Sequence, residues 1–156
     1  MSPLTRFKFF LWRFSHFKVA MIGYLKPRII TLNDTEIVIC LPLRRRSRNH
    51  VNSMYFGALA VGADLAGGLH GFYHAERSGC KVTPVFKSFQ AQFLRRAESD
   101  VYFVCTEGAT VKAMIEESKS SGGRVTKPIA IKAYTDYLNQ PEEVAAFILE
   151  MSLKVM

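Results

Sequence analysis

Apolar residues near the start of the chain recur at intervals of three and four, which is the spacing of a single helix face. The stripe consists of Phe7, Phe10, Leu11, Phe14, Phe17, Met21, Tyr24 and Leu25. We therefore expect one helix over residues 5–26, ended by Pro27. The basic residues that flank the stripe are Arg6, Lys8, Arg13 and Lys18. Two placements stay open: packing against the rest of the domain, or lying on a membrane surface.

Most of the remaining chain alternates between apolar and polar residues, the pattern of strands with two unlike faces. Residues 28–32 and 35–41 flank Asn33-Asp34 and predict a first hairpin. Further segments with this pattern are 85–93, 101–105, 129–134 and 145–154. The last segment could also begin as a helix, because Pro141-Glu142-Glu143 is a favourable helix start.

Two more helices are expected inside the strand-rich part. The first, residues 54–70, contains Gly57, Ala58, Ala60, Gly62, Ala63, Ala66, Gly67 and Gly68. Each glycine costs about 1 kcal/mol of helix stability relative to alanine, so we expect another backbone to approach this helix closely. The second covers residues 109–121 and ends at Gly122-Gly123.

This order of elements predicts an α+β fold with helices against one mostly antiparallel sheet. The 156 residues suit a single core, which we divide into an N-terminal amphipathic helix, 1–27, and a main domain, 28–156. No apolar run reaches the roughly 20 residues of a membrane-spanning helix, and charges interrupt any signal-peptide pattern, so a cytoplasmic location is expected. The cysteines at 40, 80 and 105 are expected to be free thiols.

A net charge of +8 favours an anionic partner such as nucleic acid, an anionic lipid or a phosphorylated cofactor. No nucleic-acid-binding module accompanies the charge, so nucleic acid is not expected as a partner. His70 and His74 are four residues apart, but no third ligand follows at a telling distance, so no metal is expected.

The segment from residue 49 to 64 carries the clearest chemistry. In a regular helix over 54–70, Gly57, Ala60 and Asp64 share one face. A carboxylate there is explained by an ion pair, by capping or by catalysis, and spacing alone does not decide. The backbone N–H groups of residues 54–57 lack partners within the helix, so they could stabilise an oxyanion.

The same segment resembles the signature of hot-dog-fold thioesterases of the phenylacetate-degradation (PaaI-like) type, within a largely uncharacterised bacterial branch. That signature reads N-x-x-G-x-x-H-G-G, with an acidic residue later on the helix. Asn49, Gly57 and Asp64 match it in register. Tyr55 stands in the place of the His, and Phe56 in the place of the first Gly of the pair.

The resemblance implies a curved sheet around a central helix, and a homodimer or tetramer with sites between subunits. Asp64 would be the general base or nucleophile and Gly57 the oxyanion donor, while Asn49 and Tyr55 would orient the reacting groups. The substrate would be an acyl-CoA or related thioester, with no separate cofactor. The residues assigned to substrate binding are Asn52, Phe56, Ala60, Arg44, Arg45, Arg46 and Arg48. Those arginines are either a solvated loop or the site for the phosphates of coenzyme A. The alternative function is a non-catalytic acyl-ligand or lipid-ligand binder, or an interaction protein, on the same scaffold.

Overall fold

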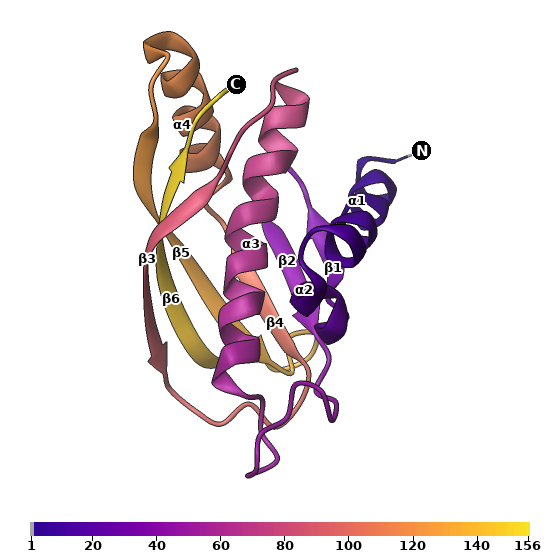
Figure 1. Ribbon diagram of the computed structural model, residues 1–156. Coiled ribbons are helices and arrows are strands. Elements are labelled where there is room, and N and C mark those ends of the chain that lie inside the picture. Colours follow the sequence, from indigo (N-terminus) through magenta and orange to yellow (C-terminus); the bar gives the residue numbers. More distant parts are fainter. Residues whose placement is uncertain (1) are drawn as a thin grey trace.

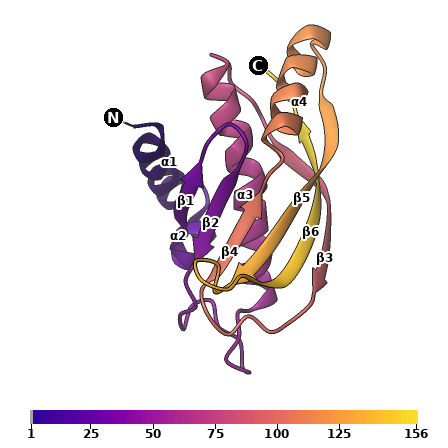
Figure 2. The ribbon, with the colours of Figure 1, turned by 180° about the vertical axis from the view of Figure 1, so that it is seen from behind.

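Six strands form one antiparallel sheet in the computed structural model, which describes residues 2–156. The strands are β1 (Arg28–Leu32), β2 (Ile37–Leu41), β3 (Val85–Phe93), β4 (Val101–Cys105), β5 (Val125–Thr135) and β6 (Glu142–Leu153). Their order across the sheet is β1-β2-β4-β5-β6-β3, so β1 and β3 are the two edges (Figure 2). The sheet curves around one long helix, as Figure 1 shows, which confirms the α+β prediction.

The predicted first hairpin is confirmed. β1 and β2 pair antiparallel, and the turn between them is held by the side chain of Asn33. Its Oδ1 atom accepts hydrogen bonds from the backbone N–H groups of Thr35 and Glu36, both at 2.9 Å. The turn is therefore fixed by an amide side chain at its first position, as such turns commonly are.

The alternative of a helical start for the last segment is wrong. β6 begins at Glu142, and Glu142 and Glu143 already pair with Thr135 and Tyr134 of β5. The apolar residues that follow alternate onto the inner face of the sheet, so burial overrides the local helix signal. Both β5 and β6 are longer than the alternating segments that predicted them.

The central helix, α3 (Phe56–Arg77), lies across the concave face of the sheet (Figure 1) and extends past the predicted end at residue 70. The expectation that a backbone approaches its glycines is wrong. A Cβ atom on Gly62 would overlap the buried ring of Phe103, and one on Gly67 would lie 3.2 Å from the ring of Phe86. Aromatic side chains from the sheet therefore fill the space beside the helix.

Helix α4 (Gly108–Ser121) confirms the second internal helix. Val111, Met114, Ile115 and Ser118 form its buried side, which packs against α3 and β5. The helix ends at Gly122, whose φ of 68° lies in the left-handed region that favours glycine.

The prediction of one N-terminal helix over residues 5–26 is wrong, because the chain forms α1 (Pro3–Phe17) and α2 (Ala20–Leu25). α2 folds back onto α1 so closely that a Cβ atom on Gly23 would lie 2.9 Å from the carbonyl oxygen of Ser15. The break leaves Phe17, Met21 and Tyr24 exposed, although the helical stripe included them.

Both N-terminal helices contribute to the same core as the sheet, through Phe7, Leu11, Ile22 and Leu25. The division into residues 1–27 and 28–156 stays a prediction, and Met1 lies outside the described residues. None of the helices within residues 2–156 is both long enough and apolar enough to cross a membrane.

Candidate functional site

The start of α3 is anchored by the loop that precedes it. The N–H of Met54 donates to the carbonyl of Ala97 at 2.8 Å, and the N–H of Tyr55 donates to the carbonyl of Ser47 at 2.7 Å. Within residues 2–156, the N–H groups of Phe56 and Gly57 donate to no acceptor. The positive end of the helix thus keeps two free donors, which is the arrangement that binds anionic or polarised oxygen atoms.

Tyr55 covers this helix start. A Cβ atom on Gly57 would overlap the Tyr55 ring, so the ring can occupy its position only because residue 57 has no side chain. The ring itself is half exposed. Tyr55 and Gly57 are therefore in contact, and their roles in the predicted site stay predictions.

A groove of about 510 Å³ opens beside the helix start. One wall comes from Tyr55, Phe56 and Leu59, and the other from residues 93–97, which include the last residue of β3 and the segment after it. The rings of Phe56 and Phe93 meet edge to face at 6.4 Å. Sequence reasoning missed residues 94–97 of this second wall, although Leu94-Arg95-Arg96 directly after a predicted strand is an apolar and basic signal that could have pointed to them.

Asn49 lines the groove, but its side chain forms its hydrogen bonds within its own loop. Its Oδ1 accepts from the N–H groups of Val51 and Ser53, and its Nδ2 donates to Ser53 Oγ at 3.0 Å. Asn52, at the first glycine of the signature, has a φ of 61°. This left-handed conformation favours glycine and is tolerated by asparagine, so Asn52 adopts a backbone conformation that a glycine at this position would also favour.

Asp64 lies two helical turns beyond Gly57, on the side of α3 that the sheet does not cover, together with the half-buried Ala60. Its carboxylate forms no hydrogen bond or ion pair with any residue from 2 to 156, and it caps nothing, because it is in the helix interior. The Asp64 side chain is exposed, but the protein atoms around its carboxyl group partly desolvate it, which raises the pKa of that group. Seven residues at about 1.5 Å rise each place Gly57 and Asp64 of one chain about 10 Å apart along the helix axis.

The arginines of the loop over residues 44–48 lie in two different places. Arg48 pairs with Met54 beside the helix start. Arg46 instead stacks its guanidinium over the Tyr24 ring at 5.2 Å and donates to the Tyr24 carbonyl at 3.2 Å. Arg44, Arg45 and Arg46 line a second groove of about 650 Å³ together with Lys26 and Arg28.

His70 and His74 lie on α3, where they are buried against the β1–β2 turn. His70 Nε2 lies 3.0 Å from the carbonyl of Asn33. Burial, followed by the neighbouring His70, lowers the pKa of His74 to about 4, so both rings are neutral at neutral pH. Within residues 2–156, no three His, Cys, Asp or Glu residues gather as a metal-binding group.

A curved antiparallel sheet around a central helix defines the hot-dog fold, and solved structures with thioesterase names share it with this chain. One, from Pseudomonas aeruginosa, is of unknown function with a suggested thioesterase activity; it is 20% identical, with a TM-score of 0.78 and coverage of 94% of this chain and 95% of that one. A candidate thioesterase from Shewanella oneidensis is 13% identical, with a TM-score of 0.79 and 97% of each chain covered. A thioesterase from Haemophilus influenzae is 13% identical, with a TM-score of 0.67 and coverage of 99% of this chain and 92% of that one.

The family is given by the sequence itself. Residues 8–141 match the family described as Domain of unknown function (DUF4442), and the chain belongs to it. A comparison with curated proteins gives no match. At these identities the solved structures establish the fold, and the chemistry has to be argued from the residues of this chain.

Proposed function

We propose that this protein hydrolyses a thioester, either an acyl-CoA or a related compound, in the manner of the phenylacetate-degradation type of thioesterase that residues 49–64 resemble. One observation carries the proposal. A helix start with two free N–H donors opens into an apolar groove, and the exposed side of the same helix carries a carboxylate without an ion-pair partner among residues 2–156.

In the proposed reaction, the Gly57 N–H donates to the carbonyl oxygen of the thioester and stabilises the negative charge that forms there. Asp64 removes a proton from water, which attacks the carbonyl carbon; direct attack by the carboxylate is the other route. The carbon–sulfur bond then breaks, and the thiol leaves with a proton. A raised pKa makes the Asp64 carboxylate a stronger base than an ordinary aspartate.

In this proposal, the two groups come from different copies of the chain. A separation of about 10 Å along one helix is too long for a donor and a base to act on the same carbonyl. The edge strand β3 supports pairing between copies, because it has a neighbour on one side only and exposes Phe89 and Phe93. We therefore include a homodimer, or a tetramer built from such dimers, in the proposal.

The groove provides the substrate site in this proposal. Phe56 and Phe93 contact the acyl part, and the small side chain of Ala60 leaves room next to it. Asn49, which donates only one of its two amide N–H groups to residues 2–156, positions the water or the carbonyl, and Tyr55 orients the thioester. Asn52 and Arg48 belong to the loop before the helix and do not line the groove, and we assign them to contacts with the same substrate. Arg44, Arg45 and Arg46 bind the coenzyme A phosphates from the groove that they line with Lys26 and Arg28.

The experiment is an assay of free thiol released from a panel of acyl-CoAs. We expect turnover by the wild-type protein and a loss of at least about 100-fold in kcat for Asp64→Asn, since a general base contributes roughly 100- to 10,000-fold. The matched control is Asp136→Asn, at an exposed turn where asparagine suits the φ of 50°. Full activity in Asp64→Asn contradicts the proposed mechanism.

The alternative of a non-catalytic acyl-ligand binder keeps one observation in its favour, because Tyr55 and Phe56 replace two residues of the signature. Saturable binding of acyl-CoA without release of thiol would support the binder over the hydrolase. Alanine at Arg44, Arg45 and Arg46 should raise the KM for acyl-CoA but leave that for a short thioester without phosphates unchanged.

A further inference from the structure

Helix α1 is apolar on two sides, and the fold uses only one of them. Phe7 and Leu11 are buried against the rest of the protein. On the outward side, Phe9, Trp12 and Phe17 are 55%, 49% and 74% exposed. We call these three residues the aromatic ridge. Exposed aromatic residues that adjoin one another are costly in water and are typical of an interaction surface.

The aromatic ridge is continuous. The rings of Phe9 and Trp12 stack at 5.9 Å, and those of Trp12 and Phe17 meet edge to face at 6.3 Å. None of these three side chains is needed to close the core, because Phe7, Leu11, Ile22 and Leu25 already do so. The ridge therefore offers an apolar surface that the isolated chain leaves open to solvent.

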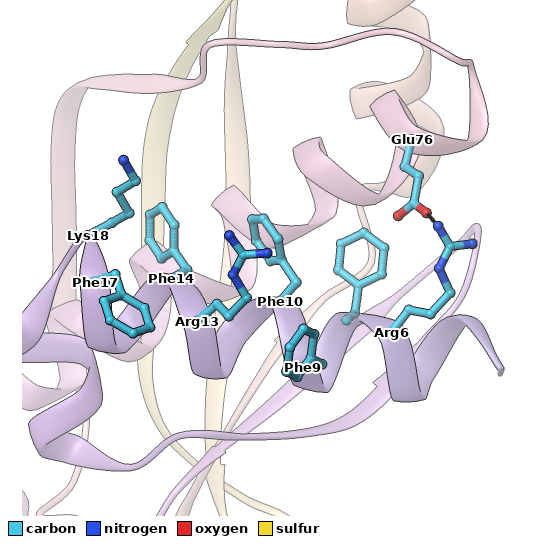
Figure 3. A pocket seen from close by; sticks show the side chains of 9 residues that line it. Arg6, Phe9, Phe10, Arg13, Phe14, Phe17, Lys18 and Glu76 are labelled. Atoms are coloured by element: carbon cyan, nitrogen blue, oxygen red, sulfur yellow. Dashed lines mark ion pairs between the residues drawn. The ribbon is translucent and has the colours of Figure 1, made fainter.

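Basic side chains border the ridge on both sides. A groove of about 690 Å³ lies between α1 and the end of α3. Figure 3 shows that Arg6, Arg13 and Lys18 lie among its phenylalanines. Glu76 in this groove is paired with Arg6. The groove on the other side, of about 580 Å³, contains Lys8 and Lys26. Within residues 2–156, Lys8, Arg13 and Lys18 form no ion pair.

We propose that this face binds the surface of a lipid bilayer that contains anionic phospholipids. The aromatic ridge enters the interfacial region, where Trp and Phe side chains are favourable, and the bordering lysines and arginines bind lipid phosphates. The helix remains part of the folded core and lies on the membrane without crossing it. This inference does not depend on the proposed hydrolase function.

Charge argues for a membrane over a second copy of the chain. Residues 1–27 contain five Lys and Arg residues and no Asp or Glu. A symmetric contact through this face would place those basic residues against one another, and like charges disfavour such a contact. The face is also free in the proposed dimer, because α1 lies against β1 while β3 is the opposite edge of the sheet.

The single tryptophan of the chain makes the inference directly measurable. We expect the Trp12 emission to shift to shorter wavelength with vesicles of phosphatidylcholine and phosphatidylglycerol, and the shift to weaken as salt is added. Vesicles of phosphatidylcholine alone should give a much smaller shift. An equal shift with both vesicles overturns the role given to the basic residues.

Point variants replace deletion of residues 1–26, because deletion would remove buried residues of the core. The variant Lys8→Gln, Arg13→Gln, Lys18→Gln should bind anionic vesicles roughly 100-fold more weakly, since each basic residue near the surface contributes about a fivefold factor. Its control, Lys112→Gln, Lys127→Gln, Lys154→Gln, has the same net charge and should bind at least ten times more tightly than the test variant. Equal affinity of the two variants overturns the proposal.

The apolar contribution is tested by Phe9→Ser with Phe17→Ser, which keeps Trp12 as the reporter. We expect the shift to be lost, whereas Leu138→Ser with Ile148→Ser, at sites that are 72% and 48% exposed elsewhere, should retain it. If the ridge variants keep wild-type vesicle binding but reduce the oligomer size by light scattering, the ridge is an interface between copies and the membrane proposal is wrong.

Discussion

Two buried imidazoles lie beside the first hairpin, and neither uses all of its hydrogen-bonding capacity. His70 Nδ1 and His74 Nε2 have no partner among residues 2–156, and the ring centroids are 4.8 Å apart. Asp34, which bonds to Tyr73 and Arg77, partly offsets the cost of a positive charge on His74. Lys112 increases that cost. Burial has the largest effect on the pKa of each ring, so both rings are neutral in the folded protein at neutral pH.

Stability should therefore fall in mild acid. The pKa of His74 is about 4 in the folded protein, against about 6.5 when the chain is unfolded, so the unfolded state takes up a proton first as the pH falls. Above pH ~6.5, His74 is neutral in both states and does not lower the free energy of unfolding. As the pH falls from there to ~4, the free energy of unfolding decreases by up to about 3 kcal/mol. Denaturant unfolding across this range measures it.

The matched variants are His74→Gln, which should flatten this part of the pH profile, and His50→Gln at an exposed position, which should not. An unchanged slope in His74→Gln would show that other groups cause the loss of stability in acid.

At the scale of elements, the glycines of α3 differ in what lies next to them. The buried Phe103 ring occupies the space beside Gly62, while the nearest atom to a Cβ on Gly71 is the Met151 sulfur, at 4.0 Å. At Gly62 the ring leaves no room for a side chain, whereas position 71 has room for a methyl group. The same residue type thus has opposite consequences for stability along one helix.

We expect Gly62→Ala to lower the free energy of unfolding by up to about 2 kcal/mol, because overpacking costs ~1–3 kcal/mol and the gain in helix propensity offsets about 1. Gly71→Ala should raise it by up to about 1 kcal/mol. Thermal and denaturant unfolding of the two variants tests the pair. Equal effects at both positions would mean that propensity, and not the Phe103 contact, determines the result.

At the scale of the whole molecule, the two edges of the sheet differ. β1 has α1 against it, while β3 is hydrogen-bonded to β6 on one side and to no strand of the described residues on the other. An open edge strand of nine residues is a site for pairing with another chain. If two copies pair there, the sites on α3 can combine groups from both chains.

Co-expression of Asp64→Asn with Gly57→Val tests this arrangement. If each site takes Asp64 from one chain and Gly57 from the other, mixed dimers contain one intact site, and random pairing restores about a quarter of the wild-type activity. If both residues act within one chain, no activity returns. A wild-type chain paired with the double variant serves as the control, because its mixed dimers should then be inactive.

The sequence predicted the sheet and the central helix well, because alternation and helical spacing depend mainly on burial. It could not show where helices break. The apolar stripe continues through Lys18 and Val19, but the chain turns there because α2 packs onto α1 at Gly23. For the site, the motif predicted Asp64 and Gly57 on one helix, but the groove wall at residues 93–97 arises from a contact between distant segments. The catalytic roles stay predictions.

One irregularity in β3 also affects how the sequence is compared with those of relatives. Phe86 pairs with Met151 and Phe89 with Leu149, so three residue steps on β3 face two on β6. The additional residue is a β-bulge. It places both phenylalanines on the same side of the sheet, although three positions, an odd number, separate them along the strand. Aligning this strand without a gap to a regular one would therefore assign one of its halves to the wrong side of the sheet. Two aromatic residues three apart in an edge strand are a sign of where such a gap belongs.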